Sequence, residues 1–275
     1  MARDETHAVV ASGLRPRPFV FVLDHARDGL LVDRSSLGPA AVAKVGASAL
    51  DPVVAWYAMP GHRVRFVRAG AGYELSVAVG GAKIEAVLSD AAAPPPIGVV
   101  ARVPGGILNA TEKGVSLAAR GTATVLGFPY DLGGGLAGYD YTHGYLARHT
   151  AWKWAFGLGR DAEGRRIGLN LVEGFIGSSE CAVWIDDEVI PVGEGRFSFD
   201  ASDPRRPWRV TTQDGVVDLT LTPGGVHAEH KDFKIVRSKF IQPSGLFRGT
   251  ISVPGRAPIR IDRMPGVTED QDILW

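Results

Sequence analysis

The segment from Gly138 to Gly159, GYDYTHGYLARHTAWKWAFGLG, concentrates side chains that can take part in chemistry. It contains three tyrosines, two histidines, two tryptophans and one aspartate. Protonating an isolated alkene requires a strong acid in an apolar pocket, and a carboxylic acid that desolvation keeps neutral can supply the proton. Asp140 is the best-placed acid of the segment, and the faces of Trp152 and Trp154 can stabilise the cation that forms.

The residues around Asp140 offer partners for such an acid. In an extended strand, Tyr139, Tyr141 and His143 share one face, and Asp140 and Thr142 share the other. The two tyrosines and His143 can orient the acid or return a proton to it. We therefore predict Asp140 and His143 as catalytic residues and Tyr139 and Tyr141 as substrate-binding residues.

The tryptophan pair also fits a strand. In TAWKWAF, Thr150, Trp152, Trp154 and Phe156 fall on one face, and the two indoles form an apolar wall that would line a barrel. We predict that Trp152 and Trp154 bind substrate and lie in the interior. A structural role is the alternative, with both tryptophans in the core and Asp140 bonded to turn amides or to an arginine.

The rest of the chain has the pattern of strands and turns. Its 35 glycines and 18 prolines separate short segments in which apolar and polar residues alternate. In RIGLNLV, Ile167, Leu169 and Leu171 share one face, and Asn170 lies on the other, where we predict that it binds substrate. The one segment that favours a helix is residues 38–50, GPAAVAKVGASAL.

Short alternating segments at this spacing predict an all-β protein, an antiparallel sandwich or barrel with little helix. The glycine-rich stretch LGGGLAG, which ends at Gly138, is the best candidate for a boundary. We place the boundary near residue 135, which divides the chain into two β-rich halves, residues 1–135 and 136–275.

The charge balance bears on partners and location. Thirty basic and thirty acidic residues give a formal net charge of +0 at pH 7, so no overall field attracts nucleic acid or anionic lipid. The chain has no run of eighteen apolar residues, and its start, MARDETHAVV, lacks the pattern of a signal peptide. We expect a soluble cytoplasmic protein with no nucleic-acid partner and no membrane span.

The sequence carries no familiar metal or cofactor motif. The single cysteine, Cys181, excludes multi-cysteine metal sites, and its alternation with Val183 and Ile185 indicates a small core residue. His227 and His230 have a spacing compatible with one metal, but HAEHKD is typical of an exposed hairpin. The glycine patterns lack the strand, helix and downstream acid of a dinucleotide site. We expect no metal, no nicotinamide and no flavin.

Several longer motifs occur in order along the chain. They are NATEKGVSLAARGTATV, YDYTHGYLARHTAWKWAFGLGRDAEGRRIGLNLVEG, SSECAVWIDDEVIPV, PWRVTTQDGVVDLTLTP and the ending PGVTEDQDILW. Together they resemble an uncharacterised bacterial family, domain of unknown function 2804, from about residue 50 to Trp275. The resemblance implies roles for Glu180 and Glu269 in a pocket or between barrels, so we predict that both bind substrate. We expect the indole of Trp275 to pack against the protein.

More distantly, the aspartate and histidine followed by a tryptophan pair and a hairpin are similar to motifs of tandem lipocalin-like proteins. That group includes carotenoid hydratases, tocopherol cyclases and fungal Diels–Alder cyclases. The resemblance implies two calycin-like barrels, or strongly curved sheets, with an apolar ligand near their joint. Those enzymes carry an Asp-His-x-Trp-Gly type motif, whereas DYTHG spaces Asp140 and His143 differently.

Together these observations predict a cofactor-independent, acid-catalysed cyclase, hydratase or isomerase that acts on an isoprenoid-like or polycyclic apolar molecule. The alternative is a non-catalytic, lipocalin-like carrier in which Asp140 and His143 hold a polar end of the ligand. A structural protein that uses its barrels as an interaction surface is a third possibility.

Overall fold

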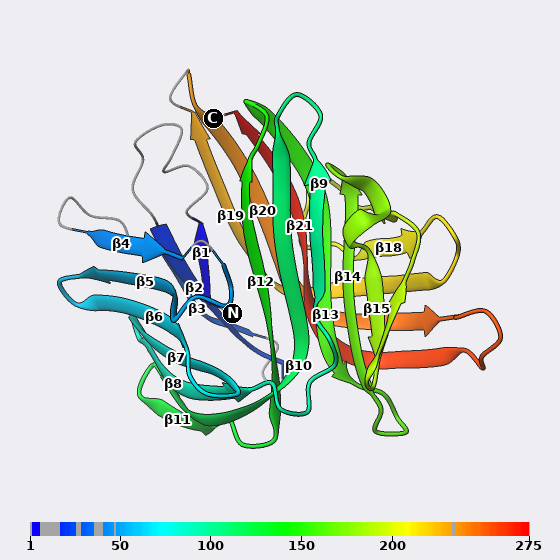
Figure 1. Ribbon diagram of the computed structural model, residues 1–275. Helices are drawn as coiled ribbons and strands as arrows, with labels where there is room; N and C mark the ends of the chain where they lie inside the picture. The colour runs from blue at the N-terminus through cyan, green and yellow to red at the C-terminus, as the bar shows by residue number, and fades with distance from the viewer. Residues whose placement is uncertain are drawn as a thin grey trace. The chain divides into compact units, whose positions relative to one another are not determined.

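The computed structural model of the chain describes residues 2–5, 17–25, 29–35, 41–46, 48–232 and 235–274. Strands dominate this part of the chain, and its one helical element is the single 3-10 turn η1 (Gly177–Glu180) (Figure 1). The strands pair antiparallel throughout the registers of both large sheets. The predicted all-β, antiparallel fold is confirmed.

Two further expectations concern membrane-spanning segments and the C-terminal tryptophan. No helix among the described residues is long and apolar enough to cross a membrane. The terminal residue Trp275, for which we predicted packing against the protein, lies outside the described residues.

The chain forms two compact units. Their bounds are Met1–Ala93 with Leu117–Ala137 for the first unit, and Pro94–Ser116 with Gly138–Trp275 for the second. Two strands, β10 (Leu108–Val125) and β12 (Gly135–Tyr145), contribute to both units. The sequence-based division placed residues 94–116 in the first half. They belong to the second unit, where the first part of β10 pairs with β9 (Ile97–Arg102).

The first unit contains a three-stranded sheet, β1-β2-β3, and strands β4 to β8 and β11 of a nine-stranded sheet. Buried side chains from both sheets, among them Val20, Val32, Tyr57 and Val77, form one apolar cluster. The strands are β1 (Ala2–Glu5), β2 (Arg17–Asp24), β3 (Gly29–Ser35), β4 (Val42–Val45), β5 (Val53–Met59), β6 (His62–Arg68), β7 (Gly72–Val79), β8 (Ala82–Ser89) and β11 (Phe128–Asp131).

The helix predicted for residues 38–50 is wrong. In the described part of this segment, Val42–Val45 form strand β4, which pairs with β5. Exposed and half-buried side chains alternate along β4, and Ala43 packs against the apolar cluster of the first unit. The segment contains two glycines and two valines, which favour a helix little, so pairing and packing decide its structure.

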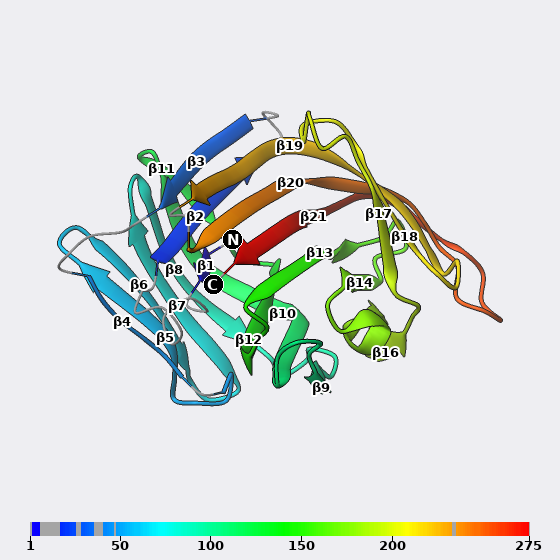
Figure 2. The same ribbon diagram turned by 90° about the horizontal axis from the view of Figure 1, so that it is seen from above.

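The second unit is built on another nine-stranded sheet, in the order β16-β15-β14-β13-β21-β20-β19-β18-β17. The sheet curves from β16 round to β17 (Figure 2), so that Gly195 of β17 lies against the main chain of Val172 in β14. The strands are β13 (His149–Arg160), β14 (Arg166–Gly174), β15 (Ala182–Ile185), β16 (Glu188–Pro191), β17 (Gly195–Ser198), β18 (Trp208–Thr212), β19 (Val217–Asp232), β20 (Arg237–Ile251) and β21 (Ile259–Leu274).

Strand β13 packs apolar side chains on both of its faces. Its registers with β14 and β21 are unbroken, so its side chains alternate strictly between the faces. Ala155 lies on the same face as its partner Leu171, and both are fully buried in the apolar core. Trp152 and Trp154 lie on the opposite face, together with Glu269 of β21. The predicted common face of the two tryptophans is confirmed.

Glycines allow β10 to approach its neighbours closely. A Cβ atom on Gly168 of β14 would lie 2.9 Å from Cγ2 of Val115, and one on Gly114 would lie 2.3 Å from Cε1 of Tyr139. Side chains cannot overlap to this extent in a close-packed interior. Gly168 therefore lets the Lys113 face of β10 approach β14, and Gly114 makes room for the Tyr139 ring on the opposite face.

We expect Gly114→Ala to lower the free energy of unfolding by about 1–3 kcal/mol, the usual cost of overpacking a filled site. Urea unfolding followed by tryptophan fluorescence measures this change. Gly98→Ala on β9 is the matched control, because a Cβ atom at Gly98 meets nothing within 4 Å. Equal losses in the two variants would contradict the close approach.

Candidate active site

The candidate site is built around a buried lysine, Lys113 of β10. The pairing of β10 with β9 is continuous from Leu108 to Lys113, so Thr111 and Lys113 point to the same face. Lys113 is 3% exposed. An ammonium group removed from water in this way requires compensating charge.

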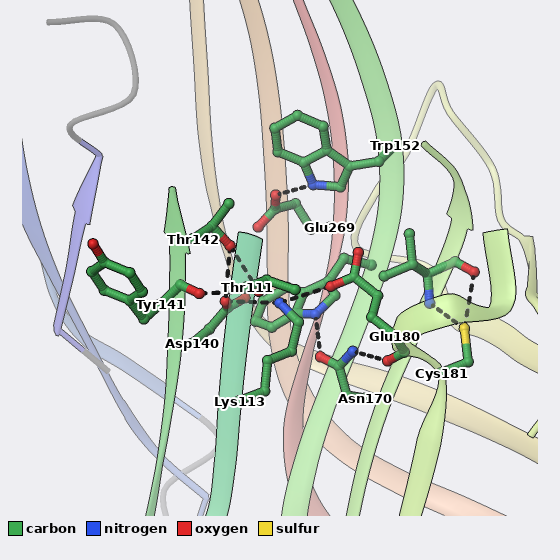
Figure 3. Close-up of polar contacts among 12 residues, drawn as sticks. Thr111, Lys113, Asp140, Tyr141, Thr142, Trp152, Asn170, Glu180, Cys181 and Glu269 are labelled. Carbon is green, nitrogen blue, oxygen red and sulfur yellow. Dashed lines mark hydrogen bonds and ion pairs between the residues drawn. The ribbon is translucent and has the colours of Figure 1, made fainter. Parts of the chain in front are cut away.

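Two carboxyl groups reach Lys113 from different elements (Figure 3). Oδ1 of Asp140 in β12 lies 2.7 Å from Nζ of Lys113, and Oε2 of Glu180 in η1 lies 3.2 Å from it. The side chain of Glu180 is 4% exposed and that of Asp140 is 24% exposed. Asp140 therefore lies at the more accessible end of the group and Glu180 at the enclosed end.

The environment favours a proton on Glu180. Burial raises the pKa of Glu180; Lys113 opposes this effect, and the charge of Asp140 adds to it. Burial opposes the charged form of Lys113, but Asp140 and Glu180 outweigh it and raise the pKa of the ammonium group. One ammonium neutralises one carboxylate, so the arrangement favours a Lys113–Asp140 ion pair beside a neutral Glu180.

Asn170 of β14 holds the main chain of Glu180 in place. Its Oδ1 accepts a hydrogen bond from Nε1 of Trp154 at 2.7 Å, and its Nδ2 donates to the Glu180 carbonyl oxygen at 2.7 Å. The Nζ atom of Lys113 lies 5.8 Å from the centre of the Trp154 ring. The structure thus brings three of the predicted residues together, Trp154, Asn170 and Glu180. Hydrogen bonds at both ends of the Asn170 amide fix its orientation.

Two threonines support the Asp140 side of the group. The Thr142 hydroxyl donates to Oδ1 of Asp140 at 3.3 Å, and Oγ1 of Thr111 lies 3.1 Å from Oγ1 of Thr142. The Thr111 hydroxyl also donates to the Tyr141 carbonyl oxygen at 3.0 Å. These contacts tie β12 to β10 beside the ion pair.

A second polar group lies on the tryptophan face. Nε1 of Trp152 donates to Oε1 of Glu269, and Nε2 of Gln242 donates to Oε2 of the same carboxyl group, each at 2.9 Å. Glu269 is fully buried, and the half-buried Trp152 ring packs against Phe175. The structure therefore joins Trp152 and Glu269, two of the predicted residues.

The three remaining predicted residues lie on the other side of β12. The Tyr139 hydroxyl donates to Oε1 of Glu112, whose side chain points away from the Lys113 face of β10. The Tyr141 ring points away from the Asp140 carboxyl group (Figure 3), and His143 is exposed. The structure does not bring these side chains to Asp140, and their roles in catalysis and binding stay predictions.

The sequence analysis did not single out Lys113, Thr111 or Gln242. A signal for the first two exists in NATEK, where Asn109, Thr111 and Lys113 alternate with other residues and so share a strand face. Three polar side chains on one face more often mark a solvated face, so the pattern alone does not indicate burial.

The histidines and the cysteine are arranged differently from a metal site. His227 is buried, which overturns the predicted exposed hairpin at that residue, and its Nε2 lies 3.7 Å from Oε1 of Glu229. His230 is exposed and, by alternation along β19, lies on the opposite face. Cys181 is buried, and burial raises the pKa of its thiol. Within the described ranges, no three metal-ligating side chains are grouped to hold an ion.

The first unit has a groove of about 580 Å³ on its own sheet. Its lining includes Arg63, Ser76 and Glu85. The Ser76 hydroxyl donates a hydrogen bond to Oε1 of Glu85 at 3.0 Å, and Nη2 of Arg63 lies 3.9 Å from the same oxygen. These charged side chains are exposed and compensate one another. The acid that lines this groove beside Arg63 is therefore exposed, unlike Glu180.

The sequence matches the family model described as Domain of unknown function (DUF2804) over residues 18–275. The protein belongs to the DUF2804 family. The match begins nearer the N-terminus than residue 50, where the motifs indicated that the similarity starts. No curated protein sequence matches the chain.

Solved structures place this DUF2804 protein in the fold of the tandem lipocalin-like group. Kievitone hydratase from Nectria haematococca is 12% identical, with a TM-score of 0.52, over 94% of this chain and 80% of that chain. CghA with Sch210972 is 8% identical, with a TM-score of 0.57, over 95% of this chain and 80% of that chain. These likenesses establish a shared fold.

We expect Lys113→Met to lower the free energy of unfolding by about 3–5 kcal/mol, because it leaves buried carboxyl groups without their cation. Urea unfolding at neutral pH measures the loss. Lys239→Met is the control, since Lys239 is half-exposed and lies 3.5 Å from Asp270, a surface pair worth about 0–1 kcal/mol. Similar small losses in both variants would show that Lys113 is not the central charge of the site.

The raised pKa of Glu180 predicts a pH-dependent stability. A carboxyl group with a raised folded-state pKa stabilises the fold fully below its unfolded pKa, about 4.3, and this contribution is lost as pH rises through the folded pKa. Glu180→Gln has no such dependence, so its free energy of unfolding should rise relative to wild type between about pH 4 and pH 8.

Urea unfolding of the two proteins across this range tests the sign. Glu163→Gln is the control, because the side chain of Glu163 is 67% exposed. A constant difference between wild type and Glu180→Gln would mean that Glu180 titrates as it does in the unfolded chain.

Proposed function

We propose that the protein is a cofactor-independent enzyme that protonates a carbon–carbon double bond of an apolar, isoprenoid-like or polycyclic molecule. Glu180 donates the proton, and Lys113 and Asp140 set its acidity. The observation that carries the proposal is a buried carboxyl group with a raised pKa, placed 3.2 Å from a buried ammonium group. Kievitone hydratase, whose name describes a hydration, supports it through the common fold.

The proposed step begins with a proton moving from Glu180 to one alkene carbon. The π electrons form the new C–H bond, and the other carbon becomes a cation. In a hydratase, water adds to the cation and returns one of its protons to Glu180. In a cyclase, a second double bond adds to the cation, and the new cation then loses a proton to Glu180. In an isomerase, Glu180 takes a proton back from an adjacent carbon. Each route balances without an oxidant, a reductant or a metal.

Lys113 makes the transfer easier because it stabilises the product of the step. Before transfer, the Lys113–Asp140 pair and the neutral Glu180 carry no net charge. After transfer, Glu180 is a carboxylate beside the ammonium group, and the three groups together are negative. This charge attracts the cation on the ligand, so the site stabilises both products of proton transfer.

The tryptophan face supplies an apolar wall for the ligand. Trp154 donates its N–H to Asn170, and Trp152 donates its N–H to Glu269, so both polar ends are engaged with the protein. The half-buried ring of Trp152 can then offer its face to a cation. A carrier would need the same wall, so turnover must distinguish the two functions.

The test starts with ligands extracted from the purified protein and identified by mass spectrometry. The compound found is incubated with the protein in deuterium oxide, and deuterium in the product is measured. Glu180→Gln should keep binding but lose turnover by about two to four powers of ten, the usual range for a lost general acid. Glu163→Gln, an exposed glutamate, should leave turnover unchanged.

Asp140→Asn separates the roles of the two acids. Asp140 contributes to the raised pKa of Glu180, so its replacement should move the upper limit of activity to lower pH and leave residual turnover at acidic pH. A complete loss at every pH would instead make Asp140 the proton donor, as the sequence suggested. Binding with no deuterated product in any protein would identify a carrier and end the proposal.

A further inference from the structure

One buried side chain on the Lys113 face of β10 has no hydrogen-bond partner. Asn109 is 1% exposed, and neither its Oδ1 nor its Nδ2 is bonded to any other described residue. The continuous pairing with β9 places Asn109 on the same face as Thr111 and Lys113. Thr111 and Lys113 both have partners on this side, so Asn109 is the unsatisfied member of a polar row.

The other buried asparagine of the second unit shows the contrast. Asn170 is also buried, but both ends of its amide are hydrogen-bonded, one to Trp154 and the other to Glu180. An unpaired buried amide destabilises a fold, and such groups are rare in native proteins. A ligand that bonds to the amide removes the cost, and buried polar groups left unsatisfied by the folded chain occur at functional sites.

We propose that Asn109 binds the polar end of the ligand through both atoms of its amide. The complementary group has a donor and an acceptor side by side and is neutral, as in a lactam, a primary carboxamide or an enolised 1,3-dicarbonyl. A carboxylate does not fit, because it has no donor for Oδ1 of Asn109.

The position of Asn109 along β10 indicates how long the ligand is. Four residues of a strand span about 13 Å, so the Asn109 amide lies roughly that far along β10 from Lys113. If Glu180 protonates the ligand, as proposed above, the polar end and the reacting double bond are separated by a distance typical of a fused-ring system. This part of the inference rests on the proposed function, whereas the polar contact does not.

A first experiment needs no ligand. Asn109→Leu replaces an unpaired amide by an apolar side chain of similar size, so the urea midpoint of the ligand-free protein should rise. Asn170→Leu breaks two hydrogen bonds and should lower the midpoint. A fall for both variants, or failure of Asn109→Leu to fold, would show that Asn109 is bonded in the free protein and would overturn the proposal.

A second experiment uses 2-quinolone, a fused-ring lactam, and N-methyl-2-quinolone, which lacks the donor. Titration calorimetry should show that the wild type binds 2-quinolone about fivefold more tightly, the effect of one buried hydrogen bond. Asn109→Leu should bind the two compounds equally. The preference should persist in Glu180→Gln, so the result is independent of the protonation chemistry.

The outcomes separate the two proposals. Equal binding of both quinolones by the wild type, or a preference that survives in Asn109→Leu, would overturn the role of Asn109 and leave the acid chemistry in place. A preference that depends on Asn109, combined with unchanged turnover in Glu180→Gln, would support the anchor and reject the acid.

Discussion

The interaction on which the second unit depends is the one between the buried ammonium of Lys113 and its two acids. Removing such a group from water costs several kcal/mol even after the surroundings relax. The compensation comes from Asp140 in β12 and Glu180 in η1, so both elements must be held against β10. The hydrogen bonds of Thr142 and Asn170 fix them there. Strand β12 and the 3-10 turn η1 therefore meet at one buried charge.

The second acid distinguishes this group from a structural ion pair. Lys113 and Asp140 alone would form a neutral pair, and a hydrophobic replacement would often serve stability as well. Glu180 adds a carboxyl group that the available positive charge does not fully balance, so it holds its proton to higher pH. The feature that weakens the site as a stabilising interaction is therefore the feature that equips it to donate a proton.

The sequence predicted the features that depend on residues close together in the chain, such as the faces of a strand. It missed the contacts between residues that are far apart in the chain. Strand alternation placed Trp152 and Trp154 on one face, because the register of β13 has no bulge. The same alternation separated Asp140 from Tyr139 and His143. It could not show that Lys113 lies beside Asp140 and Glu180, since these two acids are 27 and 67 residues away from Lys113 along the chain. The predicted helix at residues 38–50 failed for a related reason, because pairing with β5 outweighs weak local preferences.

Trp154 links the apolar core of the second unit to the candidate site. Its ring belongs to the apolar core, whereas its Nε1 atom donates to Asn170, which in turn holds the main chain of Glu180. Close-packed interiors resist displacement, so the core fixes Trp154, and Trp154 fixes the orientation of the Asn170 amide. The enclosed acid is thus held through one side chain by residues that take no part in its chemistry.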